Sequence, residues 1–213
     1  MSDWLAATAP LLAPAFSLAG SAVSWLELVA LVLAVWMVLC NFRVNPLAWP
    51  LAMASSALYG LLFLHSKLYG EAGLQLLFIT LAGWGWWQWQ RGTGASGQPL
   101  VVHWLGSRRR WLAAALTLAA WPVLGLLLQR LTDSDVPYLD ALPTVGSIAG
   151  QLLLARKQVE NWPVWAAVNI VSVALFATKG LWLTAALYAL FTVLALAGWQ
   201  RWARLAQQGR AHG

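Results

Sequence analysis

The sequence predicts an all-α integral membrane protein with seven transmembrane helices, arranged as two three-helix repeats joined by a bridging helix. Three observations support this prediction: a composition that is 61% hydrophobic and only 9% charged, apolar runs of span length, and one Trp-rich pattern that occurs twice. A soluble globule of 213 residues would need more charged surface than this chain offers. Each crossing of a bilayer needs about 20 apolar residues.

The apolar runs predict spans at approximately 22–41, 46–64, 70–89, 111–130, 138–156, 162–178 and 181–202. A polar Gly/Ser linker at 92–99 follows the first three spans. The predicted organisation is therefore an N-terminal apolar segment at 1–21, a first repeat at 22–91, a linker and bridging helix at 92–130, a second repeat at 131–203 and a tail at 204–213. Within the first segment, residues 4–18 are apolar but contain Pro10 and Pro14. We expect a short interfacial or partly inserted helix there, with an extra span as the alternative.

The duplicated pattern sets the relation between the two halves. Trp49-Pro50, Lys67 and Gly83-Trp84 with Trp87 correspond to Trp162-Pro163, Lys179 and Gly198-Trp199 with Trp202, at offsets of 113, 112 and 115 residues. Direct fusion of two three-span units would invert the second unit, and one additional span restores its orientation. The prediction is a 3+1+3 plan of parallel repeats, as in sugar-transporting SWEET proteins, with a site shared by the halves.

The distribution of Lys and Arg predicts the orientation. Ten of the 13 basic residues fall in one set of loops: Arg43, Arg91, Arg108, Arg109, Arg110, Arg156, Lys157, Arg201, Arg204 and Arg210. The other set holds Lys67, Arg130 and Lys179. Because cytoplasmic loops carry the excess of basic residues, we expect the N-terminus outside and the C-terminus in the cytoplasm.

Polar and aromatic residues inside the sixth span predict a binding site. Trp162, Trp165, Asn169 and Ser172 share one helix face, and Trp49, Ala52, Ser56 and Tyr59 are the matching positions in the first half. Such a face must meet protein or a water-filled cavity rather than lipid. Trp would stack on a flat ring and Asn would bond its polar edge. The alternatives are interfacial belt residues for Trp162 and Trp49, and an interhelical hydrogen bond for Asn169.

Other buried polar residues extend this candidate site. Gln75 and Tyr188 match at an offset of 113 residues, and Thr144 lies seven residues before Gln151 on the same helix face. Simple packing is the alternative for each. The predicted substrate-binding residues are Trp162, Trp165, Asn169, Gln151, Gln75, Tyr188, Trp49, Tyr59 and Thr144.

The sequence offers little for catalysis or energy coupling. The histidines, at 65, 103 and 212, lack the spacing of metal ligands, and no phosphate-binding Gly loop occurs, so we expect no enzyme activity, metal or cofactor. Glu27, Glu71 and Asp140 fall near span ends rather than at mid-depth, which favours passive transport. Lone Cys40 is expected to pack in the apolar interior. The run of arginines at 108–110 suits topology and anionic lipid headgroups better than nucleic acid.

The last third of the chain closely resembles the PnuC family of bacterial vitamin transporters, chiefly nicotinamide riboside transporters. The matching residues are Asp140 with Thr144, Leu154-Ala155-Arg156-Lys157, Glu160-Asn161-Trp162 with Trp165, Lys179-Gly180, Tyr188, and Gly198 with Trp202. The resemblance implies a seven-span homotrimer in the bacterial inner membrane, with facilitated diffusion through each protomer and trapping by a cytoplasmic kinase that phosphorylates the vitamin. Many relatives have Asp where this chain has Asn169, so thiamine and riboflavin are alternative substrates. A non-transporting membrane subunit is the alternative class.

Overall fold

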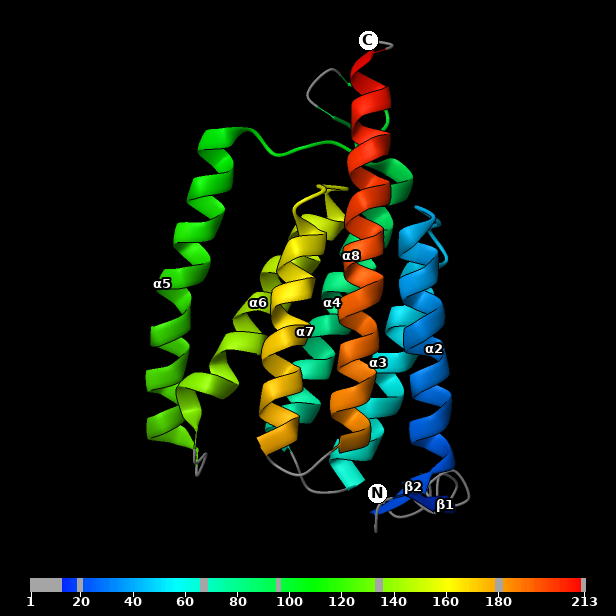
Figure 1. The fold of residues 1–213 in the computed structure, drawn as a ribbon, viewed down its shortest axis with the longest axis vertical. Helices are drawn as coiled ribbons and strands as arrows, with labels where there is room; N and C mark the ends of the chain where they lie inside the picture. The colour runs from blue at the N-terminus through cyan, green and yellow to red at the C-terminus, as the bar shows by residue number, and fades with distance from the viewer. Residues whose placement is uncertain are drawn as a thin grey trace. The chain divides into compact units, whose positions relative to one another are not determined.

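The computed structural model describes residues 13–18, 21–65, 69–94, 97–132, 136–178 and 182–211. Within these ranges seven helices follow a short hairpin (Figure 1). The elements are β1 (Pro14–Leu18), β2 (Ser21–Ser24), α2 (Trp25–Phe42), α3 (Ala48–His65), α4 (Tyr69–Arg91), α5 (Ser107–Leu131), α6 (Pro137–Ala155), α7 (Asn161–Thr178) and α8 (Trp182–Ala211). The chain forms two compact units, Met1–Trp87 and Gln88–Gly213, so that α4 begins in the first and ends in the second.

Each of the seven predicted spans corresponds to one of these helices, and most boundaries agree within four residues. The largest difference is at the end of α8, which continues to Ala211 instead of ending near residue 202. Among the described helices, α2 and α5 alone have both the length and the uniform hydropathy of a single span, and Ala48–Leu62 and Asn161–Ala177 are shorter apolar stretches. Between them, the remaining helices carry Gly, Ser, Thr and amide residues, which membrane bundles use at helix–helix contacts.

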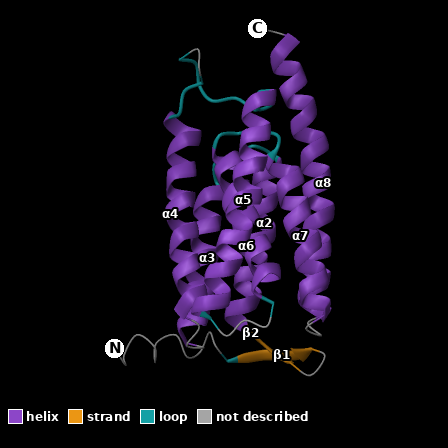
Figure 2. Cartoon of the chain, turned by 90° about the vertical axis from the view of Figure 1, so that its left-hand side faces the viewer, coloured by secondary structure: helices purple, strands orange, loops and turns teal. Residues whose placement is uncertain are grey.

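The helix expected over residues 4–18 is wrong for the part that the structure describes. Pro14–Leu18 form a β-strand that pairs antiparallel with Ser21–Ser24, before the start of α2 (Figure 2). A proline cannot donate to a strand ladder or continue a helix, and it is tolerated at the first position of a strand, where Pro14 lies. Residues 4–12 lie outside the described part of the chain.

Glu27 caps the first helix of the bundle. The Ser24 backbone N–H donates to Glu27 Oε2 at 2.7 Å, and the Glu27 N–H donates to Ser24 Oγ at 3.2 Å, which together form a capping box. The carboxylate therefore stabilises the N-terminus of α2, where the helix dipole also favours negative charge.

The two helix–loop–helix connections α2–α3 and α6–α7 have the same backbone conformation. Val44 and Lys157, 113 positions apart, are the two described non-glycine residues with positive φ, at 56° and 53°. Asn45 N–H donates to Cys40 O at 2.9 Å, and Gln158 N–H donates to Leu153 O at 3.0 Å, again 113 positions apart. Sequence duplication is thus accompanied by duplication of local structure.

Within the second unit, glycines allow the helices to approach closely. A Cβ built on Gly146 of α6 would lie 2.5 Å from Val168 of α7, and one on Gly125 of α5 would collide with the Tyr138 ring of α6. Small residues at such contacts bring backbones together where no hydrophobic effect drives association.

In the first unit, Cys40 packs with Ala48 and Leu51 at the junction of α2 and α3, which confirms its expected packing role.

Candidate functional site

The predicted polar face of α7 is turned into protein. Trp162, Asn169 and Ser172 are 3%, 6% and 3% exposed, whereas Ile170, beside Asn169, is 57% exposed. Trp165 is half-buried on the same face. The helix therefore has an apolar outer side and a polar, aromatic inner side, as the spacing predicted.

Helix α6 meets this face through Gly150. A Cβ built on Gly150 would lie 3.0 Å from Cε2 and 3.1 Å from Nε1 of the Trp165 indole, so the absence of a side chain lets the ring lie against α6. Gln151, the next residue, is buried. Thr144, seven residues earlier, is half-buried, and its hydroxyl donates to Asp140 O at 3.1 Å. Trp165 of α7 therefore packs on α6 at Gly150, one residue before Gln151.

The carboxamides of Gln151 and Asn169 have unused hydrogen-bonding capacity. Neither side chain makes a hydrogen bond to any residue in the described ranges, and both are more than nine-tenths buried. A buried amide left unpaired costs about 1–3 kcal/mol. Such groups are stabilised by water or by a bound polar molecule.

Trp162 belongs to an aromatic cluster in which Trp202 is the central ring. Its ring meets Trp202 edge-on at 5.6 Å between centroids and lies directly over Gly198, and Trp202 meets Trp89 at 6.1 Å. Trp89 Nε1 donates to Leu154 O at 3.1 Å. The buried Trp162 Nε1 has no hydrogen-bond acceptor within the described residues. Packing therefore occupies much of the Trp162 ring, and Trp165 presents the more accessible indole of the pair.

Tyr188 of α8 belongs to a separate aromatic group in this unit. It stacks on Phe176 at 5.2 Å with an interplanar angle of 28°, and it meets Phe191 edge-on at 6.1 Å. In the first unit, Gln75 and Tyr59 are half-buried, and a Cβ on Gly60 would lie 3.5 Å from Gln75 Cβ.

Trp49 repeats the environment of Trp162 and corrects the predicted register. Trp49 is 1% exposed and covers Gly85, just as Trp162 covers Gly198, and both pairs are related by an offset of 113 residues. Gly83, which the sequence comparison matched to Gly198 at an offset of 115, has no heavy atom within 4 Å of a built Cβ. The register based on Gly83 is therefore wrong, because Gly-Trp occurs twice in succession and only packing distinguishes the copies. Lys67 and Lys179 lie outside the described residues.

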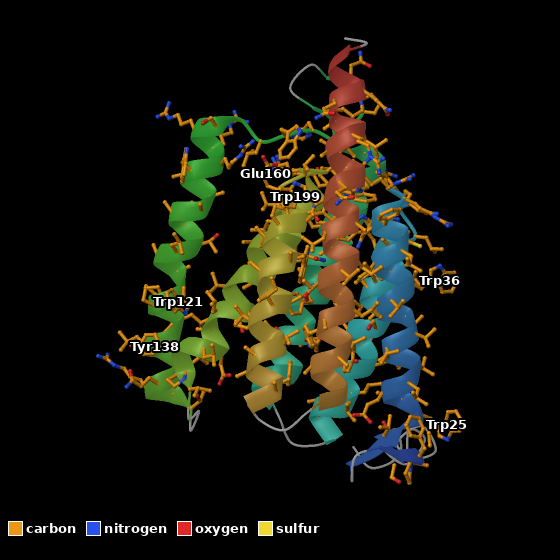
Figure 3. The ribbon with its side chains drawn as sticks, viewed as in Figure 1. Trp25, Trp36, Trp121, Tyr138, Glu160 and Trp199 are labelled. Carbon is orange, nitrogen blue, oxygen red and sulfur yellow. The ribbon has the colours of Figure 1, made fainter. Side chains whose placement is uncertain are left out.

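A tether between the linker and the α6–α7 loop was missed by the sequence reasoning. Buried Glu160 accepts hydrogen bonds from Leu105 N–H, at 3.1 Å to each carboxylate oxygen, and forms an ion pair of 2.8 Å with Arg110. Figure 3 shows Glu160 at the start of α7, beside the linker that leads to α5. An acidic residue at the edge of an apolar span was its only sequence signal, because its partners lie 50 and more residues away.

Lys157 strengthens the same connection. Its Nζ donates to Leu100 O at 2.8 Å and lies 5.1 Å from the centre of the Trp89 ring. The backbone of His103 pairs with the same loop. Its N–H donates to Lys157 O at 3.1 Å, and its carbonyl oxygen accepts from Val159 N–H at 3.0 Å. Burial lowers the pKa of the Lys157 ammonium below its usual value of 10.5.

Apolar helices of span length, a polar inner face and buried amides fit a multi-helix membrane protein of the transporter class. The chain belongs to the nicotinamide mononucleotide transporter family, whose profile matches residues 24–204. This confirms the resemblance based on the last third of the chain and extends it to the first half. Family membership makes the chain a multi-pass protein of the inner membrane.

Individual relatives agree with this assignment. The chain is 29% identical to the nicotinamide riboside transporter PnuC of Escherichia coli over 175 residues, covering 71% of this chain and 73% of the relative. It is 30% identical to the riboflavin/roseoflavin transporter RibM of Streptomyces davaonensis over 191 residues, covering 88% and 89%. A crystal structure of the vitamin B3 transporter PnuC superimposes with a TM-score of 0.71 at 25% identity, covering 86% of this chain and 83% of that one.

Proposed function

We propose that this protein carries a B-vitamin, with nicotinamide riboside as the first candidate, across the inner membrane by facilitated diffusion. The carrying observation is the α6–α7 pair, where Trp165 packs on Gly150 and two buried amides, Gln151 and Asn169, make no hydrogen bond to the described residues. Nicotinamide riboside has a cationic aromatic ring, which suits the face of an indole. Its ribose hydroxyls suit carboxamides, which both donate and accept.

The remaining predicted residues are proposed to contribute in their own units. Tyr188 and Thr144 belong to the second unit with Trp162, and Gln75, Trp49 and Tyr59 belong to the first. Trp162 and Trp49 are proposed to shape the site through packing on Gly198 and Gly85 rather than by stacking on the ligand.

Riboflavin is the second candidate substrate, and one observation favours it. The riboflavin/roseoflavin transporter shares 30% identity over 88% of this chain, a longer match than that to the E. coli nicotinamide riboside transporter. Asn169 is also neutral, and a neutral amide suits an uncharged flat ring system as well as a cationic one. Thiamine, whose rings an indole could also stack, is the third candidate.

Transport is proposed to be uncoupled from ion gradients. Glu27 caps α2 in its first turn, and Asp140 lies in the first turn of α6, so neither is central in its helix. A proton relay needs ionisable residues at mid-depth. Accumulation is then proposed to depend on a cytoplasmic kinase that phosphorylates the vitamin and traps it.

The 3+1+3 plan of parallel repeats, the outside N-terminus, the cytoplasmic C-terminus and the homotrimer are part of this proposal. The matching backbone at Val44 and Lys157 supports the repeat. The ten-to-three distribution of basic residues supports the orientation.

Proteoliposomes that contain only this chain test the proposal. Labelled nicotinamide riboside, riboflavin and thiamine are offered separately, with protein-free liposomes as the control. We expect one vitamin to equilibrate across the bilayer and to accumulate only when a matching kinase and ATP are enclosed. Accumulation driven by a proton or sodium gradient alone would refute uncoupled transport. Binding without equilibration would instead indicate a non-transporting subunit.

A further inference from the structure

A cleft of about 640 Å³ lies between α5, α6 and α7, and none of the proposed substrate-binding residues lines it. Its walls are almost entirely apolar and include Ala114, Leu116, Leu142, Ala149 and Val168. Arg110 and Glu160 line its one polar end. The cleft lies wholly within the second unit.

Two tethers hold α5 at the ends of this cleft. At one end, Trp121 Nε1 donates to Tyr138 O at 2.6 Å, and Figure 3 shows the two side chains near the start of α6. At the other end Arg110 pairs with Glu160. Between them α6 leans from α5 toward α7 (Figure 1), and α5 leaves Leu116 and Leu118 61% and 63% exposed although both line the cleft.

Two further arginines lie next to the polar end of the cleft, where Arg110 is paired with Glu160. Arg108 and Arg109, both exposed, lie with Arg110 in the first turn of α5. The N-cap residue, Gly106, provides no side-chain acceptor for the first N–H groups of the helix. A helix N-terminus carries partial positive charge and favours an anion. Basic residues next to a membrane span attract anionic lipid headgroups.

We propose that this cleft binds one anionic phospholipid, with an acyl chain between α5, α6 and α7 and the phosphate at Arg108 and Arg109. An apolar cleft stays free of water, so in a bilayer a hydrocarbon chain is the matching occupant. A helix from a second copy of the chain is the competing occupant of the cleft.

The test uses purified full-length protein equilibrated with equal amounts of phosphatidylglycerol and phosphatidylcholine that have the same acyl chains. Native mass spectrometry then counts the lipids retained by each chain. We expect one phosphatidylglycerol retained in preference to phosphatidylcholine. The double variant Arg108→Gln/Arg109→Gln should weaken phosphatidylglycerol binding roughly tenfold or more and abolish the preference. The control Arg43→Gln/Arg91→Gln alters two exposed arginines of the first repeat. It should retain the preference for phosphatidylglycerol.

A second pair of variants tests the cleft itself. Ala114→Phe fills the cleft and should reduce retention of both lipids, whereas Ala115→Phe, on an exposed position that does not line it, should not. Equal retention of the two lipids by the natural sequence would overturn the proposal. So would disulfide-linked pairs of chains in a Cys40→Ala/Ala114→Cys variant, because they would show that a second copy fills the cleft.

Discussion

The indole of Trp162 lies where a side chain on Gly198 would be, since a Cβ built there comes within 2.5 Å of Trp162 Cζ3. The contact joins the beginning of α7 to the middle of α8. It also leaves Trp202 edge-on to the same ring at 5.6 Å. Hydrogen in place of a methyl group at this one position thus permits the whole aromatic cluster.

Gly198→Ala should therefore destabilise the protein. Overpacking a filled contact costs about 1–3 kcal/mol, and a ring fixed on two sides cannot move aside. We expect a lower melting temperature in detergent. Gly209→Ala is the matched control in α8, because a Cβ there meets nothing within 4 Å. The control should hold or raise the melting temperature, since Ala favours a helix over Gly by about 1 kcal/mol.

A second glycine pair tests the register of the repeat. Gly85→Ala should lower the melting temperature as Gly198→Ala does, because Trp49 covers Gly85. Gly83→Ala, two positions away in the same helix, should have no such effect. The opposite result, with Gly83 the sensitive position, would restore the offset of 115 residues and reject that of 113.

Asn169→Leu should weaken ligand binding with little loss of stability. Asn169 is 6% exposed and its amide makes no hydrogen bond within the described residues, so the substitution removes none of their hydrogen bonds. Leaving a ligand group unpaired costs about 1–3 kcal/mol, or roughly 10- to 100-fold in affinity. Ligand affinity and melting temperature are measured together, with Ile170→Leu on the exposed side as the control. Unchanged affinity with a lower melting temperature would assign Asn169 to the scaffold.

Glu160→Gln should loosen the linker from the α6–α7 loop. The substitution keeps the shape of the side chain but removes the ion pair with Arg110, and it weakens the hydrogen bonds from Leu105 N–H. Hydrogen bonds to charged groups are worth about 1.5–3 kcal/mol and neutral ones about 0.5–1.5. Half of the Arg110 side chain is exposed, so solvent weakens its ion pair with Glu160. We therefore expect the free energy of unfolding to fall by about 1 kcal/mol.

The measurement is the rate of tryptic cleavage at the arginines that begin α5, together with the melting temperature. Cleavage should be faster in Glu160→Gln. Arg109→Gln also removes a charge from this turn but leaves the Arg110–Glu160 pair intact, so its melting temperature should stay unchanged. An unaltered cleavage rate in Glu160→Gln would show that the tether does not hold the linker.

Lys157 should make stability rise with alkaline pH. Burial lowers its pKa in the folded state below the unfolded value of 10.5. Between these two pKa values the unfolded chain binds more protons, so the free energy of unfolding increases as pH rises through that window. Below the folded pKa the cost of burying the charged ammonium is fully present. Lys157→Met should remove this component, which is read as the difference in melting temperature between the two proteins from pH 8 to 10.5. Parallel curves would contradict the prediction.

The sequence by itself determined the seven helices and the buried face of α7. Apolar runs of span length and the spacing of Trp162, Asn169 and Ser172 are local properties of the chain. In the hydrocarbon region of a bilayer each helix must form its own backbone hydrogen bonds and turn its polar side chains toward protein or water, so these local patterns are strongly constrained. The family followed from the motifs near Glu160-Asn161-Trp162.

The hairpin before α2 and the role of Glu160 were decided only by tertiary structure. So were the choice of Gly85 over Gly83 and the packing of Trp162 on Trp202. Gly83-Trp84 and Gly85-Trp86 are the same dipeptide, so sequence alone does not show which glycine corresponds to Gly198. The structure decides it, because Trp49 covers Gly85. Glu160 meets partners at 105 and 110, a separation that leaves no periodic trace in sequence. Contacts between distant segments arise from how helices pack, and helical periodicity records which face is buried but not what covers it.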